Sequence, residues 1–211
     1  MKLFKRIMLH VFGFAIMTFA VSLIVKTEQG AFPYDAISYY LSKIIDHEFV
    51  TIGVASIFFG LTWVLVNFII IKKAYVFWSL IIVFGFGSLM DIWFANVLVH
   101  YNPQNHEIWF NALLAFTGLI LVGFSLSIII RNKSLPLAPS EVFLVYLTGY
   151  TKKTWLSKVL IETVMIGLAL LLAVIAKDFV QIGWFTIVSA FLLGIIISLF
   201  EKVVKPIISD Y

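Results

Sequence analysis

Long apolar stretches alternate with short polar breaks along the whole chain. Six of the stretches are long enough to cross a bilayer, because a helix needs roughly 20 apolar residues to span the hydrocarbon core. They cover about 7–25, 50–71, 76–98, 108–130, 155–176 and 182–200. The pattern therefore predicts an all-α membrane protein with six transmembrane helices, folded as a single membrane domain over residues 1–211.

Two short segments interrupt this pattern, one in each half of the chain. The first, GAFPYDAISYYL, begins at Gly30 and places Pro33 and Asp35 ahead of an apolar stripe. The second, LPLAPSEVFLVYL, has Pro139 and Glu141 at the corresponding positions. Proline suits the first turn of a helix, and a carboxylate is favourable near a helix N-terminus. Each break is therefore expected to begin a new helix.

The two new helices are expected over residues 34–45 and 140–149. At 1.5 Å per residue the longer one would measure only about 18 Å, which is too short to span a bilayer. Each is therefore either a re-entrant half-helix or a helix lying in the interface. Interrupted hydrophobic segments at matching places in two halves are typical of the binding sites of transporters. The alternative is that proline and acid only start the helix, and that tyrosine only anchors it at the interface.

The two halves of the chain match each other at several positions. At one constant spacing, Pro33, Asp35, Tyr40 and Leu41 correspond to Pro139, Glu141, Tyr146 and Leu147. The same comparison pairs Ser56 with Glu162, and Asp91 with Ser198. Each half holds three spans, so the second half must enter the membrane from the opposite side. We expect two inverted three-helix repeats, over 1–105 and 106–211.

The basic residues predict the orientation of the spans. With the N-terminus in the cytoplasm, only Lys26, Lys43 and Lys177 fall outside. The others fall inside, and these are Lys2, Lys5, Arg6, Lys72, Lys73, Arg131, Lys133, Lys152, Lys153, Lys158, Lys202 and Lys205. Lysine and arginine concentrate in cytoplasmic loops. Both termini are therefore expected in the cytoplasm.

Composition excludes several classes of protein. The chain is 62% hydrophobic, only 12% charged, and contains no cysteine, which excludes a soluble domain, disulfides and cysteine-based chemistry. The net charge is +4, but the basic residues lie at span ends and form no patch for nucleic acid. His100 and His106 match no strong metal motif, and no phosphate loop or catalytic triad is visible. We expect no enzyme, no cofactor and no metal site.

Acidic residues inside spans are the main candidates for function. Asp91 and Glu162 lie within the third and fifth spans, where an acid costs a few kcal/mol or more and usually faces protein or water. The alternative is an acid that reaches the headgroups or pairs with a nearby polar group. The candidate residues of a solute or ion pathway are Asp35, Asp91, Glu141, Glu162, Ser56, Ser198, Tyr40 and Tyr146, with helix breaks at Gly30, Pro33 and Pro139. Asn67, near a span end, is expected at the interface.

Several segments resemble a known family. GAFPYDAISYYLS, TIGVASIFFGL and FGFGSLMDIWF are similar to the first half of the YczE/YitT group of bacterial integral membrane proteins, and the segments from LPLAPSEVFLVYL onward to its second half. Gly30, Pro33 and Asp35 satisfy the group's G-x-x-P-x-D motif, whereas residues 138–142 depart from its G-P-R-D-G motif. Glu162 stands where the group usually has a glutamate. The resemblance implies six spans in the bacterial cytoplasmic membrane, and it implies no substrate.

Three functions are compatible with these features. The first is a small secondary transporter or permease for an unknown small solute or ion. The second is a non-transporting membrane regulator or structural partner, acting as a homo-oligomer or with another membrane protein. The third is a substrate-binding subunit of a multi-component importer. This last is disfavoured because such subunits present an Ala-x-x-x-Ala surface to their partner on the first helix. Ala15 and Ala20 are five residues apart, so they do not share one face of the helix.

Overall fold

Residues 2–132 and 135–209 are described by the computed structural model, and within these ranges the fold is all-α. The helices are α1 (Lys2–Lys26), α2 (Pro33–Ile45), α3 (Ile52–Ile71), α4 (Ser79–Ile92), α5 (Ile108–Arg131), α6 (Pro139–Thr151), α7 (Thr154–Ala176) and α8 (Trp184–Ser209). Short turns of other helix types, Ala74–Trp78, Trp93–Val97 and Pro103–Asn105, flank α4 and precede α5. Lys133, one of the basic residues expected inside, lies outside the described ranges.

The six predicted spans are confirmed by length and composition. They cover Leu3–Lys26, Ile52–Ile71, Ala74–Val97, Ile108–Arg131, Thr154–Ala176 and Trp184–Val204. Large apolar side chains on them face outward, as Ile69 of α3 and Val164 of α7 do, each 68% exposed. Such a surface is stable in a bilayer, whereas contiguous apolar patches of this kind are rare on soluble proteins. The chain is an all-α, multi-pass membrane protein.

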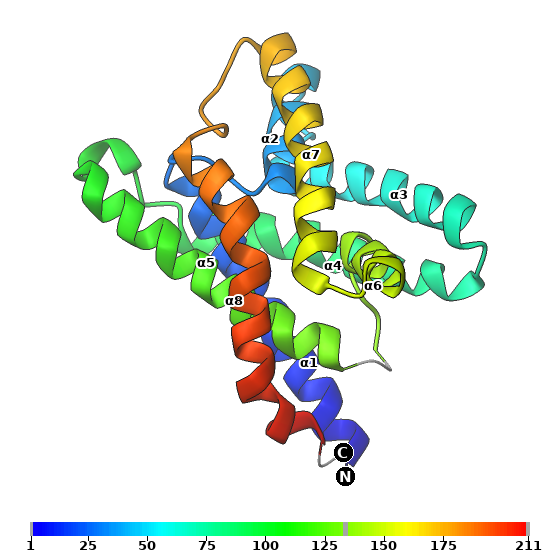
Figure 1. Cartoon of the computed structure of the whole chain (residues 1–211). Helices are drawn as coiled ribbons and strands as arrows, with labels where there is room; N and C mark the ends of the chain where they lie inside the picture. Colours follow the sequence, from blue (N-terminus) through cyan, green and yellow to red (C-terminus); the bar gives the residue numbers. More distant parts are fainter. Residues whose placement is uncertain (1, 133–134, 210–211) are drawn as a thin grey trace.

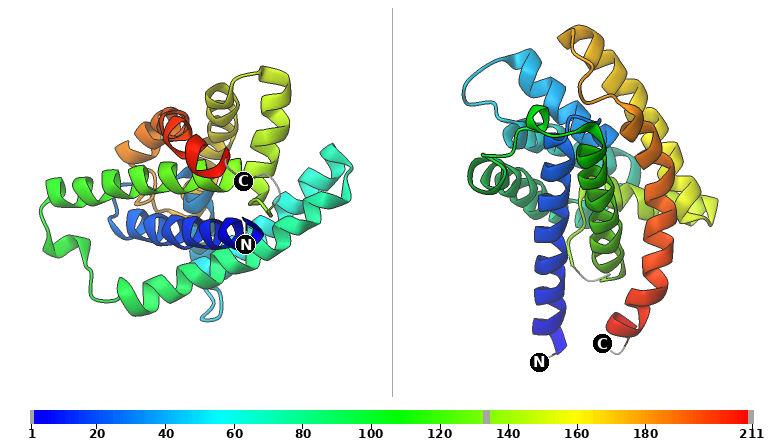
Figure 2. Two further views of the ribbon diagram at one scale, coloured as in Figure 1. Left: turned by 90° about the horizontal axis from the view of Figure 1, so that it is seen from below. Right: turned by 90° about the vertical axis from the view of Figure 1, so that its left-hand side faces the viewer.

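A central pair of helices organises the molecule. α1 and α5 share the most extensive helix–helix interface, and α8 packs on α5 as α4 packs on α1. Their shared core includes Ile24 of α1, Leu119 of α5 and Ile197 of α8, all fully buried. Gly118 lets α5 approach α1 closely, since a methyl group there would lie 2.6 Å from Ile24. α1 begins and α8 ends at the same end of the molecule (Figures 1 and 2).

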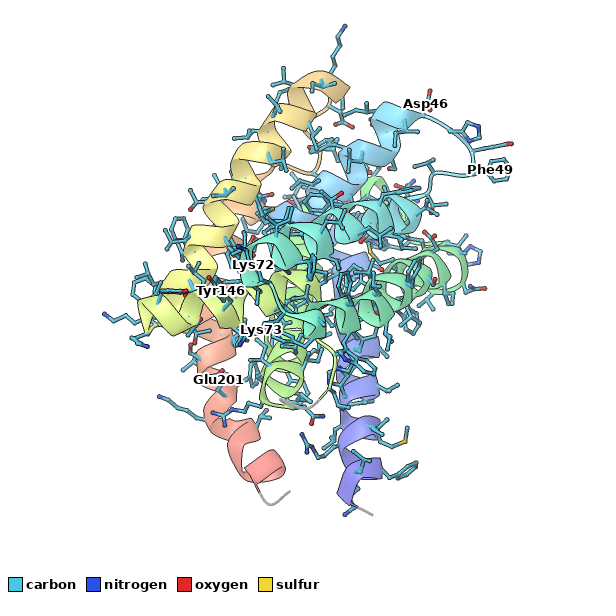
Figure 3. All side chains as sticks on the ribbon, turned by 90° about the vertical axis from the view of Figure 1, so that its right-hand side faces the viewer. Asp46, Phe49, Lys72, Lys73, Tyr146 and Glu201 are labelled. Atoms are coloured by element: carbon cyan, nitrogen blue, oxygen red, sulfur yellow. The ribbon has the colours of Figure 1, made fainter. Side chains whose placement is uncertain are left out.

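Two antiparallel helix pairs diverge from this centre. α3 packs along α4, and α7 packs along α8; Figure 1 shows the α3–α4 pair directed away from the α7–α8 pair. The short helices α2 and α6 fill the space between the pairs, because each contacts both α3 and α7. The α2–α3 loop, with Asp46 and Phe49, and the α3–α4 turn, with Lys72 and Lys73, lie at opposite ends of α3 (Figure 3).

Both predicted short helices are present. Each begins with proline at its first position, Pro33 in α2 and Pro139 in α6. In α2 the first two turns are buried, through Tyr40, whereas the last residues are exposed. Asp46 then ends the helix in the left-handed conformation. The N-terminal end of α2 is therefore inside the helix packing, and its C-terminal end is outside.

The α1–α2 linker is joined to the α7–α8 linker by backbone contacts. The amide of Ala31 donates to the carbonyl of Gln181 (3.1 Å), and the amide of Phe185 donates to the carbonyl of Gln29 (3.3 Å). Gly30 has φ +109°, a conformation that favours glycine. A methyl group on it would also lie 2.8 Å from the backbone nitrogen of Gly183. The break at Gly30 therefore serves a close approach of two linkers.

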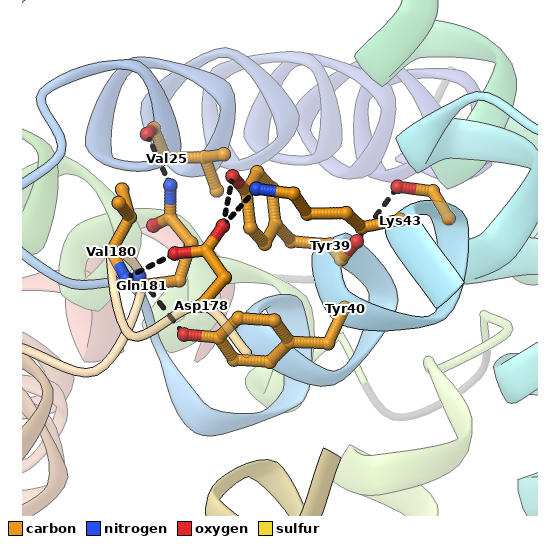
Figure 4. A network of polar contacts seen from close by, with 8 residues as sticks. Val25, Tyr39, Tyr40, Lys43, Asp178, Val180 and Gln181 are labelled. Atoms are coloured by element: carbon orange, nitrogen blue, oxygen red, sulfur yellow. Dashed lines mark hydrogen bonds and ion pairs between the residues drawn. The ribbon is translucent and has the colours of Figure 1, made fainter. Parts of the chain in front are cut away.

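A polar cluster joins the outer part of α2 to the same linker (Figure 4). Asp178 accepts hydrogen bonds from Lys43, from the Tyr39 hydroxyl (3.0 Å) and from the Val180 amide (2.8 Å). The Tyr40 hydroxyl accepts from the Gln181 amide (3.1 Å). Burial raises the pKa of Asp178, but the hydrogen bonds from Lys43, Val180 and Tyr39 outweigh it and hold the pKa below its ordinary value of 3.8.

Asp178→Ala, which removes every acceptor of this cluster at that position, should lower the free energy of unfolding by about 1 kcal/mol, since Lys43 is half exposed and solvent weakens the pair. Because the pKa of Asp178 is lowered on folding, its contribution is present above pH 3.8 and is lost as the pH falls through the folded pKa. Hydrogen exchange at the Val180 amide is the measurement, and it should accelerate in the variant. Unchanged protection relative to the wild type would contradict this role.

Candidate functional site

The N-terminal ends of α2 and α6 meet at one pocket, here called the α2/α6 pocket. It encloses about 620 Å³, its open mouth included. Its polar lining consists of Tyr34, Asp35, Ser56, Glu141, Lys158 and Glu162, with Ser140 beside Glu141. Its remaining lining is apolar and comes from α1, α4, α5 and α8 together with the starts of α2 and α6. Every long helix therefore contributes to it, including α3 through Ser56 and α7 through its charged pair.

Asp35 is placed in the pocket by the start of α2. It is the third residue of that helix, two positions after Pro33. Its side chain is buried, and its Oδ1 has no hydrogen-bond partner among the described residues. Tyr34 beside it packs against Phe59 of α3 with the rings tilted, at 4.7 Å between ring centroids. The helix start thus places a buried carboxylate in the lining of the pocket with one oxygen unsatisfied, which is costly for a buried acceptor.

Glu141 occupies the corresponding place at the start of α6. It is the third residue of that helix, and its Oε2 accepts a hydrogen bond from Ser140 Oγ (2.6 Å). The carbonyl of Pro139 accepts a hydrogen bond from Asn67 Nδ2 of α3 (2.7 Å). Asn67 is fully buried, so the expectation of an interfacial Asn67 is wrong. It holds the first residue of α6 against α3.

An ion pair on α7 completes the charged lining. Lys158 Nζ lies 2.9 Å from Glu162 Oε1 and 3.7 Å from Glu141 Oε1. Lys158 and Glu162 are four residues apart, so they lie on one face of the helix. Lys158 was counted among the basic residues of the cytoplasmic side, and the structure adds that its side chain is buried in the helix packing, with only 7% exposed. It is drawn inward because two buried glutamates require a cation.

The charges of the pocket do not balance. Three carboxylates, Asp35, Glu141 and Glu162, face one ammonium group, on Lys158. Asp35 Oδ1 and Glu162 Oε2 are buried and have no hydrogen-bond partner in residues 2–132 and 135–209. A buried charge without a partner is unstable until it gains a proton or a counter-charge. The arrangement is chemically suited to take up a proton or a positively charged group.

Five of the residues selected from the sequence line this pocket. They are Asp35, Ser56, Pro139, Glu141 and Glu162. The structure also adds Tyr34, Ser140 and Lys158, which the sequence analysis did not select. The sequence feature that could have identified Lys158 as a lining residue is its position one turn before Glu162 within an apolar run. Across the described residues, no group of three or more histidine, aspartate or glutamate side chains is arranged to hold a metal ion.

Asp91 lies outside the pocket and contacts the start of α3. Its Oδ2 accepts from Thr51 Oγ1 (2.7 Å) and its Oδ1 accepts from the Gly53 amide (3.1 Å). These are bonds to the N-terminal end of a helix, where a carboxylate is favourable. Asp91 therefore links α4 to the first turn of α3, which is the structural alternative considered for it.

The other selected residues also have separate places. Ser198 donates to the carbonyl of Gly194 within α8 (2.9 Å). Tyr146 pairs with Tyr150 on α6 (3.0 Å between hydroxyls). Tyr40 is bound to Gln181, as described above. Gly30 and Pro33 do not line the pocket, but they determine where α2 begins.

Comparisons with known proteins give a family without a known function. Residues 4–202 match the model of a family of unknown function, DUF6198. The chain is similar to the uncharacterized protein YyaS of Bacillus subtilis (strain 168), with 26% identity over 198 residues, covering 92% of this chain and 90% of that protein. No solved structure matches the chain. These matches do not connect it to the YczE/YitT group, so that resemblance stays a prediction. Since the family model spans nearly the whole chain, the protein belongs to the family of unknown function DUF6198.

Proposed function

We propose that this protein is a small secondary transporter or permease whose unknown solute or ion binds in the α2/α6 pocket. One observation carries the proposal: the starts of both short helices bring their acids, Asp35 and Glu141, to the same pocket. Helices broken at membrane depth frame the substrate sites of many transporters. A helix that only lay in the interface would not have its first two turns buried, as those of α2 are.

Sequence pairs from the two halves support an inverted repeat around the pocket. Asp35 corresponds to Glu141 and Ser56 to Glu162, and all four residues line the pocket. The packing pattern also agrees with such a repeat. α1 contacts α4 as α5 contacts α8, and α2 contacts α7 as α6 contacts α3. A binding site at the interface of two inverted repeats is the arrangement from which alternating access is built.

The proposal includes a bacterial cytoplasmic membrane location with both termini in the cytoplasm, and a transport rather than an enzymatic activity. Two features support the orientation. α1 begins and α8 ends at the same end of the molecule (Figure 2). Lys72 and Lys73 are exposed at the α3–α4 turn, where the positive-inside rule places them in the cytoplasm.

Transport should depend on free space in the pocket. Ser56→Leu would fill space beside the acids, and the uptake of any transported solute into proteoliposomes should fall to the background of empty liposomes. Thr163→Leu is the matched control, because Thr163 is exposed on the outer side of α7 and lies outside the pocket. Radiolabelled metabolites and ions of each charge class would be screened with wild type and both variants.

Two results would count against the proposal, the first against the pocket as the pathway and the second against transport itself. One is uptake that survives Ser56→Leu unchanged in a correctly folded protein, which would place the pathway elsewhere. The other is the absence of uptake across the panel together with stable co-purification of another membrane protein. That second result would favour the non-transporting regulator or structural partner.

A further inference from the structure

We infer that the α2/α6 pocket binds an organic cation with an N–H-bearing head, such as a primary ammonium or a guanidinium group, on a small apolar body. This inference rests on the proposed function and specifies its substrate class. It is carried by the charge balance, by two unsatisfied oxygens and by the apolar remainder of the lining.

The charge balance favours a cation. With all groups ionised, Asp35, Glu141 and Glu162 contribute three negative charges and Lys158 one positive charge. Lys158 already pairs with Glu162 at 2.9 Å and lies 3.7 Å from Glu141. An anionic solute would therefore find its only counter-charge already engaged, and it would face a further carboxylate on Asp35. A cationic solute would reduce the excess negative charge and so the cost of burying it.

The hydrogen-bonding demand favours a head group with N–H donors. Asp35 Oδ1 on α2 and Glu162 Oε2 on α7 are buried acceptors without a partner among the described residues. Both side chains are more than nine-tenths buried and line the pocket. A primary ammonium has three donors and a guanidinium five, so either can supply both oxygens. A quaternary ammonium carries the charge but has no donor.

The rest of the lining favours an apolar body. Around the charged group the pocket is lined by Val21, Phe32, Ile82, Phe86, Val122 and Leu126. Phe32 directly precedes α2 and Phe86 belongs to α4, so aromatic rings from two separate segments line the space. Binding sites for small molecules generally combine such apolar walls with a few placed polar groups. Because the 620 Å³ includes open solvent at the mouth, the apolar body between these walls must be small.

The test compares four probes of similar size on the purified full-length protein in phosphatidylcholine nanodiscs. n-Butylammonium carries charge and donors, tetramethylammonium carries charge alone, 1-butanol is neutral, and butyrate is an anion. Thermal unfolding reports binding, since a ligand of the folded state raises Tm. We expect n-butylammonium to raise Tm most, and Asp35→Asn to weaken its apparent affinity by about 10–100-fold.

Asp46→Asn is the matched control, because Asp46 is exposed at the C-terminal end of α2 and does not line the pocket, and asparagine also accepts its left-handed conformation. It should leave the response to n-butylammonium unchanged. Asn is close in shape to Asp and removes a buried negative charge, so Asp35→Asn is expected to fold. Glu162→Gln gives a second variant with the same expected loss. Nanodiscs with ethanolamine-headed lipid test whether a lipid supplies the ammonium, in which case the lipid should compete with n-butylammonium.

Several outcomes separate this inference from the proposed function. Stabilisation by butyrate, by 1-butanol, or by Na⁺ or Mg²⁺ alone through Asp35 would overturn the organic cation as the ligand while leaving a solute or ion site in place. Equal stabilisation by tetramethylammonium would overturn the role of the donors. If none of the four probes raises Tm, but Ser56→Leu abolishes the uptake of an anionic or neutral solute, the inference alone is refuted. If no probe raises Tm and no solute is taken up, both the inference and the proposed function are refuted.

Discussion

Lys158→Met should lower the free energy of unfolding by about 3–5 kcal/mol, because it removes the one cation that faces three buried carboxylates. Methionine matches the length of the lysine stem, so the loss of packing is small. What remains is Glu162 without its partner at 2.9 Å and Glu141 without its neighbour at 3.7 Å. Breaking one side of a buried pair costs far more than the pair contributes, since the other charge stays buried and uncompensated.

Chemical unfolding in mixed micelles, followed by circular dichroism, would measure this loss. Lys73→Met is the control for removing a lysine, because Lys73 is exposed at the α3–α4 turn. It should change the unfolding free energy by less than about 0.5 kcal/mol, as surface substitutions usually do. Equal stability of Lys158→Met and Lys73→Met would mean that Lys158 does not neutralise the pocket.

A second substitution should restore part of the stability. In Lys158→Met/Glu162→Gln the unpaired carboxylate next to the missing cation is neutral, so most of the penalty disappears. The double variant should therefore be more stable than Lys158→Met alone, and a double-mutant cycle would give the coupling energy directly. A double variant less stable than either single variant would indicate that Lys158 and Glu162 contribute independently.

The fold was predictable from the sequence because its signals are local. Six apolar runs of spanning length are sufficient to predict the six long helices, and a proline followed by an acid two residues later marks the starts of α2 and α6. The comparison of the two halves also paired Asp35 with Glu141 and Ser56 with Glu162 before any contact was known. Residues paired by an internal repeat are good candidates for meeting around its axis.

The rest of the site depended on helix orientation, which apolar composition does not encode. In a span that is apolar on all sides, no stripe indicates which face points inward. Lys158 could therefore be read as a charge at the end of a span, although the packing turns it toward Glu141. The places of Asn67 and Asp91 in the structure could not be predicted for the same reason. Their partners, Pro139 and Gly53, lie 72 and 38 positions away in sequence and are brought close only by tertiary packing.

Gly87→Ala should destabilise the protein by about 3 kcal/mol, because overpacking a helix contact forces the backbones apart. A methyl group on Gly87 of α4 would collide with the carbonyl oxygen of Gly53 in the first turn of α3, and it would lie 2.6 Å from Ile57 Cγ1. Gly53→Ala should cost a similar amount, since its methyl group would lie 2.5 Å from Asp91 Cγ. These contacts involve backbone, which cannot move aside as a side chain can.

Gly167→Ala provides the control for replacing glycine within a helix. No atom lies within 4 Å of a methyl group at Gly167, so only the intrinsic helix propensity acts, and stability should stay the same or rise by up to about 1 kcal/mol. Unfolding in mixed micelles would compare the three single variants. Equal stability of Gly87→Ala and Gly167→Ala would show that α3 and α4 are not in close contact.

The double variant Gly53→Ala/Gly87→Ala should lose clearly less than the sum of the two single losses. Both methyl groups force the same separation of α3 and α4, and once one has done so the second meets little further resistance. The same separation moves Ser56, which lies one turn after Gly53 and lines the α2/α6 pocket. A close helix contact whose glycines do not line the pocket therefore holds the α3 wall of the pocket. Solute binding should weaken in Gly53→Ala and Gly87→Ala together, and it should be unchanged in Gly167→Ala.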